Sequence, residues 1–181
     1  MAKRHSIISC ILILSIISLA HGKKERYSPP DNRAAGKTVF VGKIYDGDTI
    51  SAFVNGHFEK IRLIGIDAPE KDQRPWGRKA RECLGSLISA ADSRVSLEYD
   101  IDKRDKYGRI LAYIWTQNGQ MINEEMMKNG CAVLFTFPPN VRYAERFLVA
   151  QKKAQEHKAG IWGENGLQES PYDYRKKHPR K

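Results

Sequence analysis

Alternating apolar and polar residues divide the middle of the chain into short strands. Residues 38–45, 48–54 and 57–66 each show the two-residue period of a half-buried β-strand. Asp46-Gly47 and Asn55-Gly56 separate them, and both dipeptides favour tight hairpin turns. We therefore predict that these three strands form an antiparallel meander. Two further strands are expected at 94–99 and 110–115, and a short extended run at 131–137.

Helical periodicity appears in three other segments. Residues 76–90 and 143–159 place apolar side chains three and four residues apart, the spacing of one buried helical face. Asn123 is expected to cap a shorter helix that ends near Gly130. Five strands with a helix after the third predict an α+β, mainly β fold: a five-stranded barrel of the oligonucleotide-binding (OB) type with about three helices.

The N-terminal segment has the features of a secretory signal. Lys3 and Arg4 precede an apolar run from Ile7 to Ala20, and small residues follow. The run is shorter than the roughly 20 apolar residues that span a bilayer. We predict that residues 1–22 are a cleaved signal peptide and that the protein is secreted or periplasmic. Residues 23–36 are expected to be a linker, 37–163 the folded domain, and 164–181 a basic, disordered tail.

The formal net charge of +10 favours a polyanionic partner. Nucleic acid and an anionic membrane both fit, but no amphipathic anchor remains after the signal segment, so we expect no stable membrane association and a monomer. Cys83 and Cys131 are the two cysteines outside that segment, and an exported chain can join them. The sequence leaves this disulfide open. We expect no zinc site, because no CxxC or HExxH motif occurs and the histidines are scattered.

The stretch 61–70 carries the first candidate chemistry. It runs from a β-branched strand into a proline turn and contains Arg62, Asp67 and Glu70. A straight strand would hold Arg62 and Asp67 about 16 Å apart on opposite faces. The two can serve one site only if the chain bends between them, and Gly65 is where a bend is easiest.

Asp46 and Asp48 in the first turn add further oxygen donors. Carboxylates without soft ligands favour Ca²⁺ or Mg²⁺ over transition metals. Arg62 and Arg109 complement them, because a guanidinium binds two phosphate oxygens at once and keeps its proton. A metal with two carboxylates and two arginines suits a phosphodiester that gains negative charge as it is attacked.

Four motifs occur in one order. Asp-Gly-Asp-Thr at 46–49, Arg62 leading into Asp-Ala-Pro-Glu at 67–70, Asp-Lys-Tyr-Gly-Arg at 105–109 and Gly-Ile-Trp at 160–162 together resemble the thermonuclease family, the secreted staphylococcal-nuclease-like enzymes. The resemblance covers roughly residues 37–163. It implies an OB-type barrel and a Ca²⁺-dependent endonuclease that hydrolyses DNA and RNA with little sequence preference and leaves 3′-phosphate ends.

The resemblance also implies roles for individual residues. Asp48 and Asp67 would bind Ca²⁺, with the backbone carbonyl of Ala68 as a third ligand. Asp46 would support the metal site without contacting the ion. Glu70 would orient or deprotonate the attacking water, and Arg62 and Arg109 would hold the scissile phosphate. Substrate contacts are expected from Lys106, Tyr107, Phe135 and Phe137.

Three positions depart from the best-known members. Ala68 replaces a familiar threonine, and Phe135 and Phe137 replace tyrosines that help to hold the nucleotide, so a hydroxyl contact would be lost while base stacking remains. None removes a catalytic group. The alternative is a non-catalytic OB-type module that only binds nucleic acid. Retention of Asp48, Asp67, Glu70 and both arginines argues against it.

Overall fold

The computed structural model describes residues 38–179, and five of its strands close into a barrel in the order β1-β2-β3-β6-β5. These are β1 (Thr38–Ile44), β2 (Thr49–Val54), β3 (His57–Leu63), β5 (Arg94–Glu98) and β6 (Ile110–Trp115). β1, β2 and β3 form the predicted antiparallel meander. Closure comes from an antiparallel β1–β5 pair and a parallel β3–β6 pair. The predicted OB-type barrel is confirmed.

Strand alternation fills the barrel with apolar side chains. In β2 the inward positions are Ile50, Ala52 and Val54, and in β3 they are Ile61 and Leu63, all buried. The Asn55-Gly56 turn is the two-residue hairpin expected, with φ of 50° and 94°. The first connection is longer than a two-residue turn, because residues 45–48 all lie between β1 and β2.

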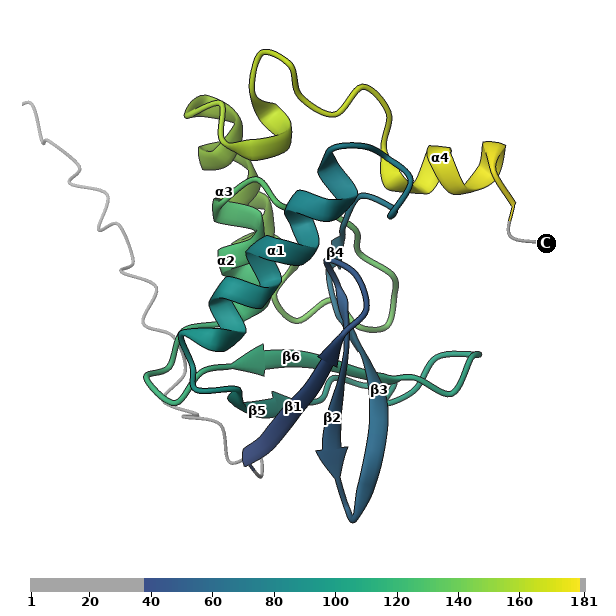
Figure 1. The fold of residues 1–181 in the computed structure, drawn as a ribbon, viewed down its shortest axis with the longest axis vertical. Coiled ribbons are helices and arrows are strands. Elements are labelled where there is room, and N and C mark those ends of the chain that lie inside the picture. Colours follow the sequence, from purple (N-terminus) through teal and green to yellow (C-terminus); the bar gives the residue numbers. More distant parts are fainter. Residues whose placement is uncertain (1–37, 180–181) are drawn as a thin grey trace, which may run out of the picture. The chain divides into compact units, whose positions relative to one another are not determined.

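Helices cover one side of the barrel (Figure 1). The predicted helices are present as α1 (Trp76–Ser89), α2 (Ile122–Lys128) and α3 (Ala144–Glu156). Their buried faces follow the expected period, as with Ala80, Leu84 and Ile88 in α1. The short strands β4 (Ile66–Asp67) and β7 (Val133–Leu134) pair beside the barrel. η1 (Gly160–Trp162) follows α3, and none of the described helices is long and apolar enough to cross a membrane.

Asn123 does not cap α2 as predicted. Met121 holds the cap position, and Asn123 lies fully buried inside the helix. Its Oδ1 accepts from the backbone N–H of Ile114 at 2.8 Å, and its Nδ2 donates to the carbonyl of Ile64 at 2.9 Å. The amide thus gives hydrogen-bond partners to a backbone N–H and a backbone carbonyl in two neighbouring segments. Without a partner, each of these buried groups would cost free energy.

The two cysteines outside the signal segment are joined in the structure. Cys83 of α1 and Cys131, just before β7, form a disulfide with their Cα atoms 6.6 Å apart. The signal segment 1–22 and the linker 23–36 lie outside the described residues.

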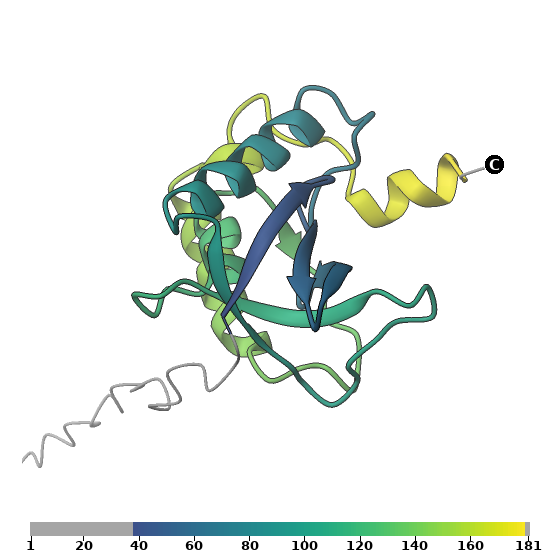
Figure 2. The same cartoon turned by 60° about the horizontal axis from the view of Figure 1, so that its bottom comes forward.

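A fourth helix, α4 (Pro171–Lys177), occupies the segment expected to be a disordered tail. Ser170 caps it: its Oγ accepts from the backbone N–H of Asp173 at 3.0 Å, and Pro171 takes the first helical position. Figures 1 and 2 both show α4 apart from α1, α2 and α3. Its contacts with Asp67 of β4, with Glu70 and with Phe135 are described below.

Candidate active site

The loop between β1 and β2 places Asp48 against the segment that follows β4. A Cβ on Gly47 would lie 2.6 Å from Cβ of Ala68 and 2.7 Å from Cβ of Ala80, so only glycine permits this approach. Asp46 steadies the loop, since its Oδ1 accepts from the N–H of Asp48 at 3.1 Å. The second oxygen of Asp48, Oδ2, accepts from the N–H of Ala68 at 2.8 Å.

A bend at Gly65 brings Asp67 back to Arg62. The glycine has φ of 80°, and β4 restarts the chain in a separate two-stranded sheet. Nη2 of Arg62 then lies 3.0 Å from Oδ1 of Asp67 and 3.1 Å from the carbonyl oxygen of Ile66. The predicted bend is confirmed: Arg62 and Asp67, which a straight strand would hold far apart, are in direct contact.

Arg62 bridges two buried carboxylates. Its Nη1 forms an ion pair with Asp48, while Nη2 pairs with Asp67; the side chains are 13%, 9% and 1% exposed respectively. Burial lowers the pKa of the Arg62 guanidinium, while the charge of Asp67 opposes that shift. Because a guanidinium keeps its proton at ordinary pH, the three groups together carry a net charge of −1, which attracts a further cation.

Arg175 of α4 supplies that cation. Its Nη1 lies 2.9 Å from Oδ1 of Asp67 and 3.0 Å from Oε1 of Glu70, and its Nη2 lies 2.8 Å from Oδ2 of Asp67. Burial lowers the pKa of Arg175, but the hydrogen bonds to Asp67 and Glu70 outweigh it and raise the pKa above the usual arginine range. A guanidinium therefore lies between the two carboxylates.

Gln73 connects the Glu70 turn to the C-terminal segment. Its Oε1 accepts from the N–H of Glu70, and its Nε2 donates to the carbonyl of Glu169, both at 2.9 Å. Neither Gln73 nor Arg175 was predicted from the sequence as a site residue. The Ser-Pro-x-Asp pattern at 170–173, typical of a helix start, was the available signal for α4.

Arg109 lies just before β6, the strand that runs parallel to β3. Its Nε donates to Oδ2 of Asp105 at 2.6 Å, and Oδ1 of Asp105 accepts from the N–H groups of Tyr107 and Arg109. The charge of Arg109 is close enough to lower the pKa of Arg62. The guanidinium of Arg109 and the ammonium of Lys106 lie 5.6 and 5.2 Å from the Tyr107 ring centre.

The two phenylalanines expected to contact substrate have different surroundings. The ring of Phe135 lies 6.1 Å from that of Tyr172 in α4, and its N–H donates to the carbonyl of Gly65. Phe137 is 73% exposed. The Phe135–Tyr172 contact means that α4 covers part of the surface assigned to the nucleotide.

The acidic cluster fits a hard cation by its donor chemistry. Within residues 38–179 no group of three or more His, Cys, Asp or Glu side chains is arranged to hold a metal. The expected ligand set is smaller, with the carboxylates of Asp48 and Asp67 and the carbonyl of Ala68. These are the oxygen donors that Ca²⁺ prefers, and the two bound guanidinium groups show that the cluster accepts positive charge.

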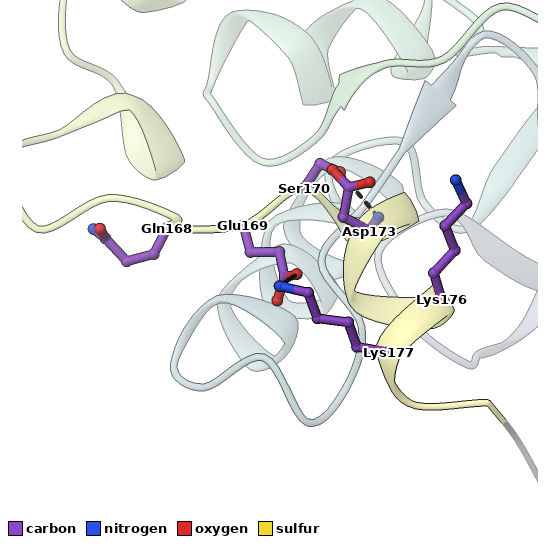
Figure 3. Close-up of a pocket in the computed structure, with 6 residues that line it drawn as sticks. All are labelled: Gln168, Glu169, Ser170, Asp173, Lys176 and Lys177. Carbon is purple, nitrogen blue, oxygen red and sulfur yellow. Dashed lines mark hydrogen bonds and ion pairs between the residues drawn. The ribbon is translucent and has the colours of Figure 1, made fainter.

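A shallow pocket lies along another side of α4 (Figure 3). Lys177 pairs with Glu169 at 2.6 Å, Oγ of Ser170 donates to Oδ2 of Asp173 at 2.6 Å, and the ammonium of Lys176 lies 4.4 Å from the Tyr172 ring centre. Arg175 is not part of its lining. Its lining residues all belong to α4 and to the segment directly before it: Gln168, Glu169, Ser170, Asp173, Lys176 and Lys177.

Comparison with known proteins identifies the family. The family model described as staphylococcal nuclease homologue matches residues 60–164. The chain is 34% identical to the thermonuclease of Staphylococcus hyicus over 161 residues, covering 86% of this chain and 93% of that protein. It is 38% identical to the thermonuclease of Staphylococcus intermedius over 132 residues, covering 70% and 77%. Endonuclease YncB of Bacillus subtilis is 33% identical, covering 71% and 63%.

The chain is a closed OB-type barrel that carries a buried cluster of arginine and carboxylate side chains at the end of β3. With the family match and relatives above, this chain belongs to the staphylococcal nuclease homologue family, as the motifs indicated.

Proposed function

We propose that this protein is a Ca²⁺-dependent nuclease that hydrolyses phosphodiester bonds of DNA and RNA and leaves 3′-phosphate ends. The observation that carries the proposal is the single buried Arg62 bridging Asp48 and Asp67. A structural ion pair needs only one carboxylate, and the second is neutralised here by Arg175 of α4, a group whose place a cationic ligand can take. The names of the thermonuclease and endonuclease relatives support the same reaction class.

Asp48, Asp67 and the Ala68 carbonyl would hold the metal ion. When bound, Ca²⁺ would supply Lewis-acid polarisation of a phosphoryl oxygen and a position for the attacking water. Arg175 must leave Asp67 before that carboxylate can bind a metal, since the guanidinium now contacts both of its oxygens. Metal binding and α4 docking thus compete.

The remaining residues act on the phosphate. Nη2 of Arg62 donates to Asp67 and to the carbonyl of Ile66, and its remaining N–H groups would bind phosphate oxygens. Glu70 would accept a proton as the water oxygen bonds to phosphorus. As the P–O5′ bond breaks, Arg109, oriented by Asp105, would stabilise the charge on the departing oxygen.

We also propose that the protein is exported. The charged and apolar pattern of residues 1–22 supports export, and so does the Cys83–Cys131 disulfide, since disulfides persist mainly in oxidising compartments. Monomeric state remains a prediction.

The test is digestion of end-labelled single-stranded DNA and of RNA by the purified chain, with Ca²⁺ or with a chelator. Cleavage only in Ca²⁺, with 3′-phosphate ends, supports the proposal. Tight binding without cleavage in Ca²⁺ would instead make the protein a binding module.

A further inference from the structure

Three exposed phenylalanines form a row across the barrel. Phe40 of β1 is in register with Phe53 of β2, which is in register with Phe58 of β3. The rings of Phe53 and Phe58 meet edge to face, with centres 5.4 Å apart. They are 55%, 48% and 60% exposed respectively. Single exposed apolar residues are ordinary, but three adjacent half-exposed aromatic rings form a patch that needs an explanation.

The row is continuous with the candidate active site. Side chains alternate along a strand, so Phe58, Lys60 and Arg62 share the outer face of β3. Phe58 and Arg62 are four residues apart, roughly 13 Å along the strand. That distance is short enough for one strand a few nucleotides long to reach both groups.

Basic groups lie between the row and Arg62. The ammonium groups of Lys43 and Lys60 lie 5.0 and 5.1 Å from the ring centre of Tyr45. Lys43 and Lys60 both stand in register with Ser51 of the intervening strand. No carboxylate stands at the strand positions that share this face, among which Thr49 and Ser51 are buried: Thr38, Phe40, Lys43, Thr49, Ser51, Phe53, Phe58, Lys60 and Arg62.

This combination of groups selects one kind of ligand. Aromatic faces that stack bases, beside lysines that follow the backbone, are the means by which proteins bind single-stranded nucleic acid. In a duplex the base faces are already stacked on one another, so they are not available to the phenylalanines. A partner protein would explain the aromatic row but not the lysines that link it to Arg62.

We propose that Phe40, Phe53 and Phe58, with Lys43 and Lys60, form a binding strip for single-stranded nucleic acid that continues from the scissile-phosphate site along β3. The proposal rests on the proposed function for the position of that phosphate, and it adds a binding surface and a preference for single strands. A strand would place its phosphates near the lysines and two or three bases on the phenylalanines.

The test measures binding without turnover. The full chain in chelator is titrated against a fluorescent 12-nucleotide oligothymidine and against a duplex, and anisotropy gives Kd. Phe53→Thr and Phe58→Thr should each raise Kd for the oligothymidine about fivefold or more, from the loss of one stacked base. Duplex binding should change much less. Val149→Thr on α3, where Val149 is 53% exposed, is the matched control and should bind normally.

Lys60→Gln provides a second readout. The slope of log Kd against log salt should fall by about 0.7 for single strands, the value for one lost phosphate contact. The strip would be overturned if both phenylalanine variants keep the wild-type Kd for the oligothymidine and Lys60→Gln keeps the wild-type salt slope. If the variants instead change the sedimentation coefficient while oligothymidine binding is normal, the row is a self-association face and the proposal is wrong.

Failure of the strip can be distinguished from failure of the proposed function. The wild-type protein could fail to cleave DNA or RNA while its phenylalanine and lysine variants still lose oligothymidine binding. That result would support the binding strip and contradict the proposed nuclease activity. Ca²⁺-dependent cleavage with the same KM for the 12-nucleotide substrate in the wild type and all strip variants would retain the nuclease and reject the strip.

Discussion

Removal of Arg175 should strengthen metal binding. In the structure its guanidinium contacts both oxygens of Asp67 and one of Glu70, at 2.8 to 3.0 Å. Arg175→Gln keeps a polar side chain in α4 but removes the charge that competes with Ca²⁺. The variant should therefore bind Ca²⁺ more tightly, whereas loss of a stabilising tertiary contact would ordinarily weaken a site.

The size of the effect follows from the contacts. Hydrogen bonds to charged groups contribute about 1.5–3 kcal/mol when formed. The Arg175 side chain is 34% exposed, so solvent screening reduces that contribution, and we take about 1–2 kcal/mol for the whole contact. Since 1.4 kcal/mol is tenfold in affinity, the Ca²⁺ Kd should fall roughly 5- to 30-fold.

Isothermal titration calorimetry of the full chain at fixed ionic strength measures this Kd. Lys177→Gln is the matched control, because it removes the same charge from the same helix but pairs with Glu169 instead. It should leave Kd within twofold of the wild type. Equal Kd values for Arg175→Gln and Lys177→Gln would refute the competition between Arg175 and the metal.

Three further changes test other parts of the structure. Cys83→Ser with Cys131→Ser opens a loop of 48 residues and should lower the free energy of unfolding by about 4 kcal/mol in urea denaturation, the chain-entropy value. Arg109→Gln should lower kcat about 10²-fold with the melting temperature unchanged. The hydrogen bond from Arg104 lowers the pKa of Glu59 to about 2, so the stability from this pair is present above pH 4.5 and is lost as pH falls toward 2. Melting temperatures of wild type and Arg104→Gln should therefore differ at pH 6 and converge at pH 2.

Local patterns predicted most of the elements because each has one buried face. The period-two runs of β1, β2 and β3 and the helical spacing in α1 and α3 each bury alternate or periodic positions, and all five lie within a few residues of the expected bounds. Barrel closure is different in kind. The parallel β3–β6 pairing joins segments far apart in the sequence, and the alternation of apolar residues within a strand does not show which other strand it pairs with.

The site was predictable where its geometry depends on local bends. Gly65 between Arg62 and Asp67 indicated where the strand must turn, and the structure places the turn there. Arg175 was not predictable, because α4 depends on contacts made across the chain: the Phe135–Tyr172 pair and the ion pairs to Asp67 and Glu70. A polar, basic segment gives no periodic sign of such long-range partners.

The catalytic role of the Arg62 cluster is tested by the single-turnover cleavage rate of Arg62→Lys on single-stranded DNA in saturating Ca²⁺. Lysine keeps the positive charge but cannot bridge Asp48 and Asp67 and also bind two phosphate oxygens. The Arg62→Lys rate should be roughly 10²- to 10³-fold below the wild type, with an unchanged far-ultraviolet circular dichroism spectrum. A folded Arg62→Lys protein that cleaves within threefold of the wild-type rate would contradict the assignment of this cluster as the catalytic centre.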